Sequence, residues 1–218
     1  MNLTERLHTP GPLYSALMMI PDPAVASVLG SCGLDFVSVD GEHGEYSPDA
    51  MRACVDTLKD VPTPVVVRPA TNDDADLRQV LDLDVDGVLV PHVETAEQVA
   101  AIVGAASAAG SATLIILESR LGIENAEAIA AVPGLDGIMG RPFGPVSGHR
   151  CRRPARPSKR ARDSIERVFA IGLEIGLKVS PWREARTDAE RDGMLVYLFA
   201  DITTLADAAK AAVDEVRR

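Results

Sequence analysis

The stretch PVVVRPATNDDADLRQVLDLDVDGVLV, at residues 64–90, contains the pattern that decides the fold. Its first part, 64–68, is a valine-rich run with the length of a buried β-strand. The next part, 73–83, spaces its apolar residues as an amphipathic helix does, and Asn72 or Asp73 can cap the first turn. A second short apolar run follows at 87–90 and predicts another strand. Strand, helix and strand in this order predict a βαβ unit with parallel strands.

The same alternation extends along the chain in both directions. Two further helices are predicted at Pro48–Leu58, where Ser47 can cap the first turn, and at Thr95–Ala108. Eight strands are predicted, at residues 13–19, 36–39, 64–68, 87–90, 113–118, 137–140, 177–180 and 195–199. No GxGxxG or GxxxxGK[ST] motif suggests an open, doubly wound nucleotide-binding sheet. The expected fold class is therefore α/β, a (β/α)8 TIM barrel.

Length, charge and cysteine content narrow the class of protein. The 218 residues fit one (β/α)8-barrel domain over residues 1–218. The net charge of −10 disfavours nucleic acid and anionic membranes as partners. Three cysteines without metal-ligand spacing indicate a reducing compartment, and the N-terminus has no apolar signal-like segment. We therefore expect a soluble cytoplasmic protein.

Polar residues follow the predicted strands at the points where a barrel enzyme carries its reactive groups. The carboxyl ends of barrel strands point toward a common mouth. An unpaired charge buried there costs several kcal/mol, so a purely structural use of all these groups would be expensive. The residues at these strand ends are Asp40, Glu42, His43, Arg68, Pro91, His92, Glu118 and Ser119.

Four blocks in this order resemble one enzyme family. They are DGEH at 40–43, VVVRP at 65–69, LRQVLDLDVDGVLVPHVETAEQ at 77–98 and LIILES at 114–119. Together they resemble the HpcH/HpaI family of 4-hydroxy-2-oxoheptanedioate aldolase-like, class II pyruvate aldolases. The resemblance covers residues 13 to about 140, and more loosely residue 193 to the end. It implies a phosphoenolpyruvate/pyruvate-like barrel that assembles as a homo-oligomer, a trimer or a hexamer.

The resemblance also implies a mechanism for a small 2-oxo acid substrate. His43 would be the base, acting through water, and Asp82 would hold its imidazole in the required tautomer. Arg68 would neutralise the enolate oxygen or the substrate carboxylate. Structural alternatives remain open: Arg68 could pair with Glu42, Asp82 could lie on a solvated acidic face, and His92 could pack at the mouth. The substrate is expected to contact Arg68, Pro91, Ser119 and Arg141.

The implied cofactor is a divalent metal, Mg²⁺ or Mn²⁺, which would act as a Lewis acid on the substrate oxygen. Glu118 would be one metal ligand. The position that matches the second ligand, an aspartate in the family, is Gly144, which has no side-chain oxygen. Another acid or water could complete the shell. Alternatively, Arg141 near Glu118 could neutralise the enolate without a cation.

The leading functional prediction is a carbon–carbon lyase that joins or splits a 2-oxo acid enolate and an aldehyde or ketone. One alternative is a Claisen-type, citrate-synthase-like condensing enzyme that uses the same enolate without a metal. Another is a catalytically silent barrel that binds a carboxylate.

Residues 149–162 hold seven of the 22 Lys and Arg residues and two prolines. This stretch is predicted to be a non-helical loop, either solvated or an anion-binding lid.

Overall fold

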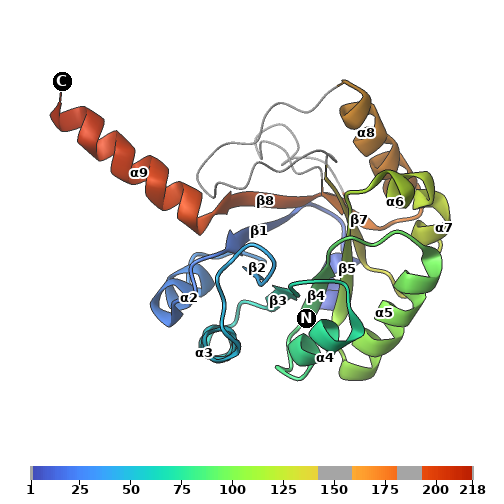
Figure 1. The fold of residues 1–218 in the computed structure, drawn as a ribbon, viewed down its shortest axis with the longest axis horizontal. Helices are drawn as coiled ribbons and strands as arrows, with labels where there is room; N and C mark the ends of the chain where they lie inside the picture. Colours follow the sequence, from blue (N-terminus) through green and yellow to red (C-terminus); the bar gives the residue numbers. More distant parts are fainter. Residues whose placement is uncertain (1, 142–158, 181–192, 218) are drawn as a thin grey trace.

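Eight parallel strands form a nearly closed barrel that helices surround (Figure 1). The computed structural model describes residues 2–141, 159–180 and 193–217. Each strand pairs with its neighbours in the order β7-β6-β5-β4-β3-β2-β1-β8, and a parallel bridge from Val179 to Met194 links the two ends. The predicted (β/α)8 barrel is confirmed. The strands are β1 Leu13–Met18, β2 Phe36–Asp40, β3 Val65–Arg68, β4 Gly87–Val90, β5 Ala112–Leu117, β6 Gly137–Gly140, β7 Lys178–Ser180 and β8 Leu195–Ala200.

The helices connect the strands on the outside of the barrel. In the described part of the chain they are α1 Leu3–Leu7, α2 Pro23–Gly30, α3 Pro48–Lys59, α4 Asp74–Leu81, α5 Ala96–Ala109, α6 Arg120–Glu124, α7 Ala126–Ala130, α8 Lys159–Glu174 and α9 Asp201–Val216. Ser47 caps α3 as predicted, because its Oγ accepts the N–H of Ala50 at 3.2 Å. Helix α8 begins at Lys159, so the end of the basic stretch is helical and that part of the loop prediction is wrong. Residues 149–158 lie outside the described residues.

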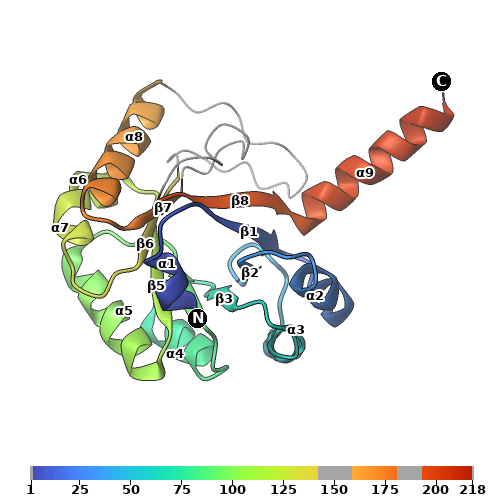
Figure 2. The same ribbon diagram turned by 180° about the vertical axis from the view of Figure 1, so that it is seen from behind.

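Alternation along the strands creates two apolar layers. Side chains of successive strand residues point to opposite faces, so Val37 and Val39 of β2 pack toward the helices while Phe36 faces the barrel interior. The interior layer also contains Leu3 and Leu7 of α1. Helix α1 therefore closes the amino end of the barrel, and it lies in front of the strands when the molecule is seen from behind (Figure 2).

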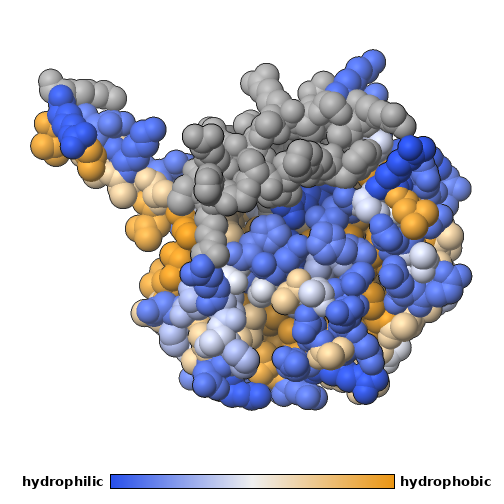
Figure 3. Space-filling view, viewed as in Figure 1, coloured by the Kyte–Doolittle hydropathy of each residue, from blue (hydrophilic) through white to orange (hydrophobic). Residues whose placement is uncertain are grey.

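The opposite, carboxyl end is polar. Hydrophilic residues gather over the middle of the face shown in Figure 3, where the apolar layers end. Helix α9 projects away from the barrel and is joined to it by Asp201, whose carboxylate accepts the backbone N–H groups of Met19 and Ile20. None of the helices in the described ranges is both long and apolar enough to cross a membrane.

Candidate active site

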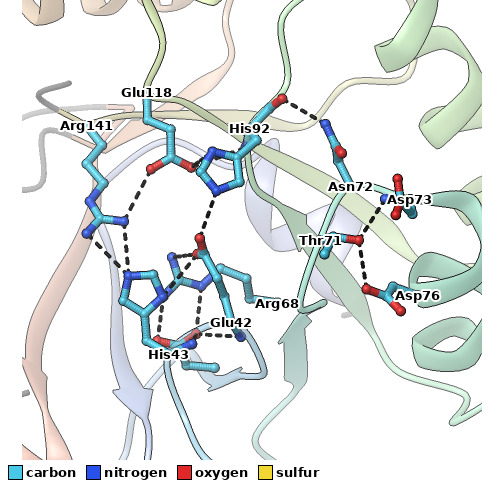
Figure 4. A network of polar contacts seen from close by, with 11 residues as sticks. Glu42, His43, Arg68, Thr71, Asn72, Asp73, Asp76, His92, Glu118 and Arg141 are labelled. Atoms are coloured by element: carbon cyan, nitrogen blue, oxygen red, sulfur yellow. Dashed lines mark hydrogen bonds and ion pairs between the residues drawn. The ribbon is translucent and has the colours of Figure 1, made fainter. Parts of the chain in front are cut away.

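Five neighbouring strands bring charged side chains together at the carboxyl end of the barrel. Asp40 ends β2, and Arg68 ends β3. The turn after β2, the segment after β4 and the ends of β5 and β6 supply the rest of the network drawn in Figure 4. The prediction that these polar residues converge on one rim is confirmed. The network consists of Asp40, Glu42, His43, Arg68, His92, Glu118 and Arg141.

The deepest element of the network is the ion pair of Asp40 and Arg68. Both side chains are 1% exposed, Arg68 Nε donates to Asp40 Oδ1 at 2.8 Å, and Nη2 donates to Oδ2. Burial alone would lower the pKa of the Arg68 guanidinium, but the charge and hydrogen bonds of Asp40, with the charge of Glu42, raise it. Asp40 Oδ1 also accepts the backbone N–H groups of Glu42 and His43. The pair therefore sets the shape of the turn that carries these two residues.

Glu42 joins the arginine to the histidine. Its Oε2 atom lies 2.7 Å from Arg68 Nη1 and 3.3 Å from His43 Nδ1 (Figure 4). The ion pair between Arg68 and Glu42, foreseen as a structural alternative, is present. Glu42 Oε2 and Arg68 Nη1 are buried but make no directed hydrogen bond. Buried polar atoms of this kind are expensive, so a ligand that supplied a partner would be favoured.

The imidazole of His43 has a defined tautomer. Arg141 Nη1 and Nη2 each lie 3.4 Å from His43 Nε2. A guanidinium has only donors, so Nε2 must accept, which leaves the proton on Nδ1, facing Glu42. Burial lowers the pKa of His43 below its ordinary value, and the charge of Arg68 lowers it further. His43 is therefore a neutral imidazole with its lone pair on Nε2, directed toward Arg141.

Among the described residues of this chain Asp82 has no contact with the network, so its pairing with His43 stays a prediction. Asp82 caps the C-terminus of α4 and is exposed. In a βα unit the helix runs back to the start of the next strand, so the C-terminus of α4 lies at the amino end of the barrel. His43 follows the carboxyl end of β2. The carboxylate next to the imidazole is that of Glu42, from the same turn.

Glu118 lies between a histidine and an arginine. Its Oε1 accepts the backbone N–H of His92 at 3.2 Å and lies 3.2 Å from His92 Nδ1. Its Oε2 accepts from Arg141 Nη1 at 3.2 Å. His92 also contacts Glu42 Oε1 through Nε2 at 3.0 Å, and its φ of +54° is a left-handed conformation that is rare outside glycine. Strain of this kind is often retained at functional sites.

The donor set does not fit the divalent cation that the family implies. Glu42, His92 and Glu118 form a carboxylate–histidine cluster whose ligand atoms lie within 4.8 Å of one another. However, both oxygens of Glu118 already have partners, one of them a guanidinium. Both ring nitrogens of His92 contact carboxylates as well. The residue at the second implied ligand position, Gly144, lies outside the described residues and brings no side-chain oxygen.

Two further residues, Ser119 and Pro91, were predicted to contact the substrate, and each is held in place by the local fold. Ser119 caps α6, because its Oγ accepts the N–H of Gly122 at 3.0 Å. Pro91 is buried directly after β4 and precedes the strained His92. Both residues lie at the carboxyl end, beside the network.

Sequence reasoning placed Asp40 and Glu42 on the rim, gave Asp40 no role and offered Glu42 only as an alternative partner of Arg68. The structure gives Asp40 four donor groups and makes Glu42 the link between Arg68, His43 and His92. The signal was available in the DGEH block itself. A turn that begins with an acidic residue commonly folds its backbone N–H groups onto that carboxylate.

The architecture and the network define a class of protein, a parallel barrel enzyme whose ionisable groups lie at the carboxyl ends of its strands. The model of the HpcH/HpaI aldolase/citrate lyase family matches residues 17–144. The chain belongs to this family and is an aldolase, a carbon–carbon lyase.

Curated relatives agree with this assignment, and solved structures share the fold. A hydroxypyruvate/pyruvate aldolase of Chromohalobacter salexigens is 30% identical over 88% of this chain and 88% of its own. A 4-hydroxy-2-oxo-heptane-1,7-dioate aldolase of Klebsiella pneumoniae is 27% identical over 85% and 82%. An HpcH/HpaI aldolase/citrate lyase family protein of Burkholderia cenocepacia superposes with a TM-score of 0.83 at 21% identity, covering 99% of both chains. The citrate synthase SbnG superposes with a TM-score of 0.84 at 21% identity, covering 99% and 97%.

Proposed function

We propose that the protein reversibly joins or splits a small 2-oxo acid and an aldehyde or ketone, through the enolate of the 2-oxo acid. The observation that carries this proposal is the neutral imidazole of His43, whose Nε2 lone pair lies within 3.4 Å of the Arg141 guanidinium. Enolisation requires a base beside a cationic group such as a guanidinium, because a proton leaves while negative charge develops on a neighbouring oxygen.

The chemical step balances with the groups at this site. The C–H bond of the pyruvate methyl group breaks, its electron pair forms a C=C bond, and the carbonyl oxygen takes the negative charge. The proton goes to His43 Nε2, and the resulting imidazolium is stabilised by Glu42 at Nδ1. The enolate carbon then bonds to the carbonyl carbon of the acceptor, the C=O π electron pair moves to the acceptor oxygen, and that oxygen takes the proton back from the His43 imidazolium. Cleavage follows the same path in reverse.

The buried arginine supports the binding of the acid. Arg68 Nη1 has an ion-pair contact with Glu42 but no directed hydrogen bond, so it retains a donor for a carboxylate or an enolate oxygen. A guanidinium suits this role because its planar fork matches two oxygens of one ligand. Asp40 holds this fork from the other side and is a positioning residue.

A Claisen-type condensation with an acyl thioester is a second candidate. The contact between Arg141 and Glu118 favours it, because the guanidinium neutralises charge where a metal-dependent aldolase would need its cation. In both candidates a methyl or methylene proton of the 2-oxo acid is removed first. In the second candidate the enolate carbon then bonds to the thioester carbonyl carbon, the C–S bond breaks and the thiolate leaves.

Proton exchange tests the shared step without knowledge of the electrophile. Purified protein is incubated with pyruvate in D2O, and the methyl signal is followed by NMR. We expect exchange in the wild-type protein and a loss of about 10²–10⁴-fold in His43→Ala, the range for removal of a general base. A matched control is His8→Ala, which removes an imidazole at the amino end. Wild-type protein that exchanges none of several 2-oxo acids would indicate a silent, carboxylate-binding barrel.

A further inference from the structure

We propose that the guanidinium of Arg141 replaces the divalent cation of the family, so that the enolate forms without a metal. This inference rests on the proposed function, since it assigns the group that neutralises the enolate oxygen. It is independent of the electrophile and of the direction of the reaction.

The position of Arg141 carries the inference. Its Nη1 atom contacts Glu118 Oε2 at 3.2 Å, the carboxylate that the resemblance implies as a metal ligand. The same fork lies 3.4 Å from His43 Nε2, the proposed base. The guanidinium therefore lies between the implied ligand and the base, where the oxygen of a forming enolate must be neutralised (Figure 4).

Burial holds the Arg141 guanidinium in one position and strengthens its electrostatic interactions. The side chains of Arg141 and Glu118 are only 11% and 8% exposed. A fork held by a buried carboxylate needs little reorganisation when charge develops beside it, and its charge is screened less than at the surface. Preorganised donors of this kind are what an oxyanion site requires.

The formal charges are consistent with the replacement of the aspartate and its divalent cation by a glycine and an arginine. The implied aspartate and a divalent cation together contribute +1, because −1 and +2 sum to +1. Gly144 and Arg141 also contribute +1, because glycine is neutral and arginine is positive. The two sets of groups therefore carry the same formal charge.

A cation in addition to Arg141 is disfavoured by the contacts of Glu118. Its Oε1 accepts from the backbone of His92 and its Oε2 accepts from Arg141. A divalent ion that bound Oε2 would have to displace the guanidinium or remain close to it, and like charges at such distances repel strongly. Mg²⁺ also requires several oxygen ligands in near-octahedral geometry.

Metal dependence is tested on the wild-type protein first. Pyruvate methyl exchange is measured after EDTA treatment and again with added Mn²⁺, and Mn²⁺ binding is followed separately by EPR. We expect the two exchange rates to agree within about twofold. We also expect the EPR titration to show no stoichiometric site at micromolar Mn²⁺.

Three variants then locate the cationic group. Arg141→Gln removes the charge and is expected to lower exchange by about 10²–10³-fold, the range for loss of one oxyanion donor. Arg141→Lys keeps the charge without the fork and should recover part of that loss. The matched control Arg120→Gln alters an exposed arginine paired with Glu124 and should leave exchange unchanged.

The outcomes separate this inference from the proposed function. Exchange that disappears with EDTA and returns with Mn²⁺ would overturn the inference while leaving the aldolase chemistry in place. One Mn²⁺ bound per chain, lost in His92→Ala, would overturn it too and would assign a cation to the Glu42–His92–Glu118 cluster. Exchange absent under every condition would overturn the proposed function and this inference together.

Discussion

The two ends of the barrel hold buried charges in different ways. At the amino end, Lys178 Nζ donates to the carbonyl oxygens of Thr9 and Gly11, both at 2.7 Å. Asp136 accepts the backbone N–H of Thr113 at 2.7 Å and contacts His8. At the carboxyl end, Arg68, Glu118 and their neighbours have mainly other side chains as partners.

The difference teaches which charges can respond to a ligand. A backbone group is fixed by the surrounding fold, so a charge that it satisfies stays where it is and serves stability. A side-chain partner can rotate or exchange one contact for another, so the network at the mouth can reorganise around a substrate. The buried charges at the amino end therefore stabilise the fold, whereas those at the carboxyl end can rearrange around a substrate.

The largest expected effect comes from Asp40→Asn, which breaks a fully buried ion pair at the mouth. It leaves Arg68 with a single carboxylate, Glu42, and removal of one partner of a buried pair costs about 3–5 kcal/mol of unfolding free energy. Pyruvate exchange should fall with it. Urea denaturation measures the loss of stability. The control Asp74→Asn, in an exposed pair with Arg78, should change stability by less than about 1 kcal/mol.

Lys178→Met tests the amino end. The substitution removes two charge-assisted hydrogen bonds to carbonyl groups and should lower the free energy of unfolding by about 2–3 kcal/mol. Exchange per folded molecule should not change, because no group at the mouth is touched. Lys210→Met, on the exposed face of α9, is the matched control. A variant of normal stability with impaired exchange would contradict the division of roles between the two ends.

The pH dependence of pyruvate exchange tests the protonation state of His43, the proposed base at the carboxyl end. Only neutral His43 accepts a proton, and burial followed by the charge of Arg68 lowers its pKa below 6.5. Exchange should therefore be level above pH 6.5 and fall about tenfold per pH unit below the lowered pKa. Exchange rates measured between about pH 5 and pH 8 define this fall in rate. A fall centred above pH 6.5 would show that His43 is not the neutral base.

The same shift affects stability with a defined sign. The unfolded chain protonates His43 near pH 6.5, before the folded chain does, so the unfolded state binds more protons in this range. The free energy of unfolding should therefore fall as the pH decreases through this value. His43→Gln should lack this contribution.

The smallest expected effect belongs to His92→Asn. Asparagine tolerates the left-handed backbone at this position, so the unfolding free energy should change by less than about 1 kcal/mol. Exchange should fall by less than about tenfold, because His92 contacts Glu42 and Glu118 rather than the base. His92→Val should be clearly less stable than His92→Asn, since a β-branched residue is strained at φ +54°. Equal stability of the two variants would contradict the assigned strain.

Much of the fold was predictable from local pattern. Strands 87–90 and 137–140 were predicted with the bounds that the structure has, and the other six differ by one residue at one or both ends. The cap of α3 by Ser47 was also foreseen. Within this chain the carboxylate beside His43 is that of Glu42, whereas Asp82, the predicted partner, ends a helix that runs back to the amino end of the barrel.

The sequence by itself determined the barrel and the set of polar residues at its mouth, because apolar periodicity and strand ends depend on neighbours along the chain. Only the tertiary structure decided which of those residues touch. Glu42 meets both Arg68 and His43, and Arg141 reaches Glu118, because the register of β2 to β6 brings their ends level. Such contacts depend on ångström distances between strands far apart in the chain, which no local pattern encodes.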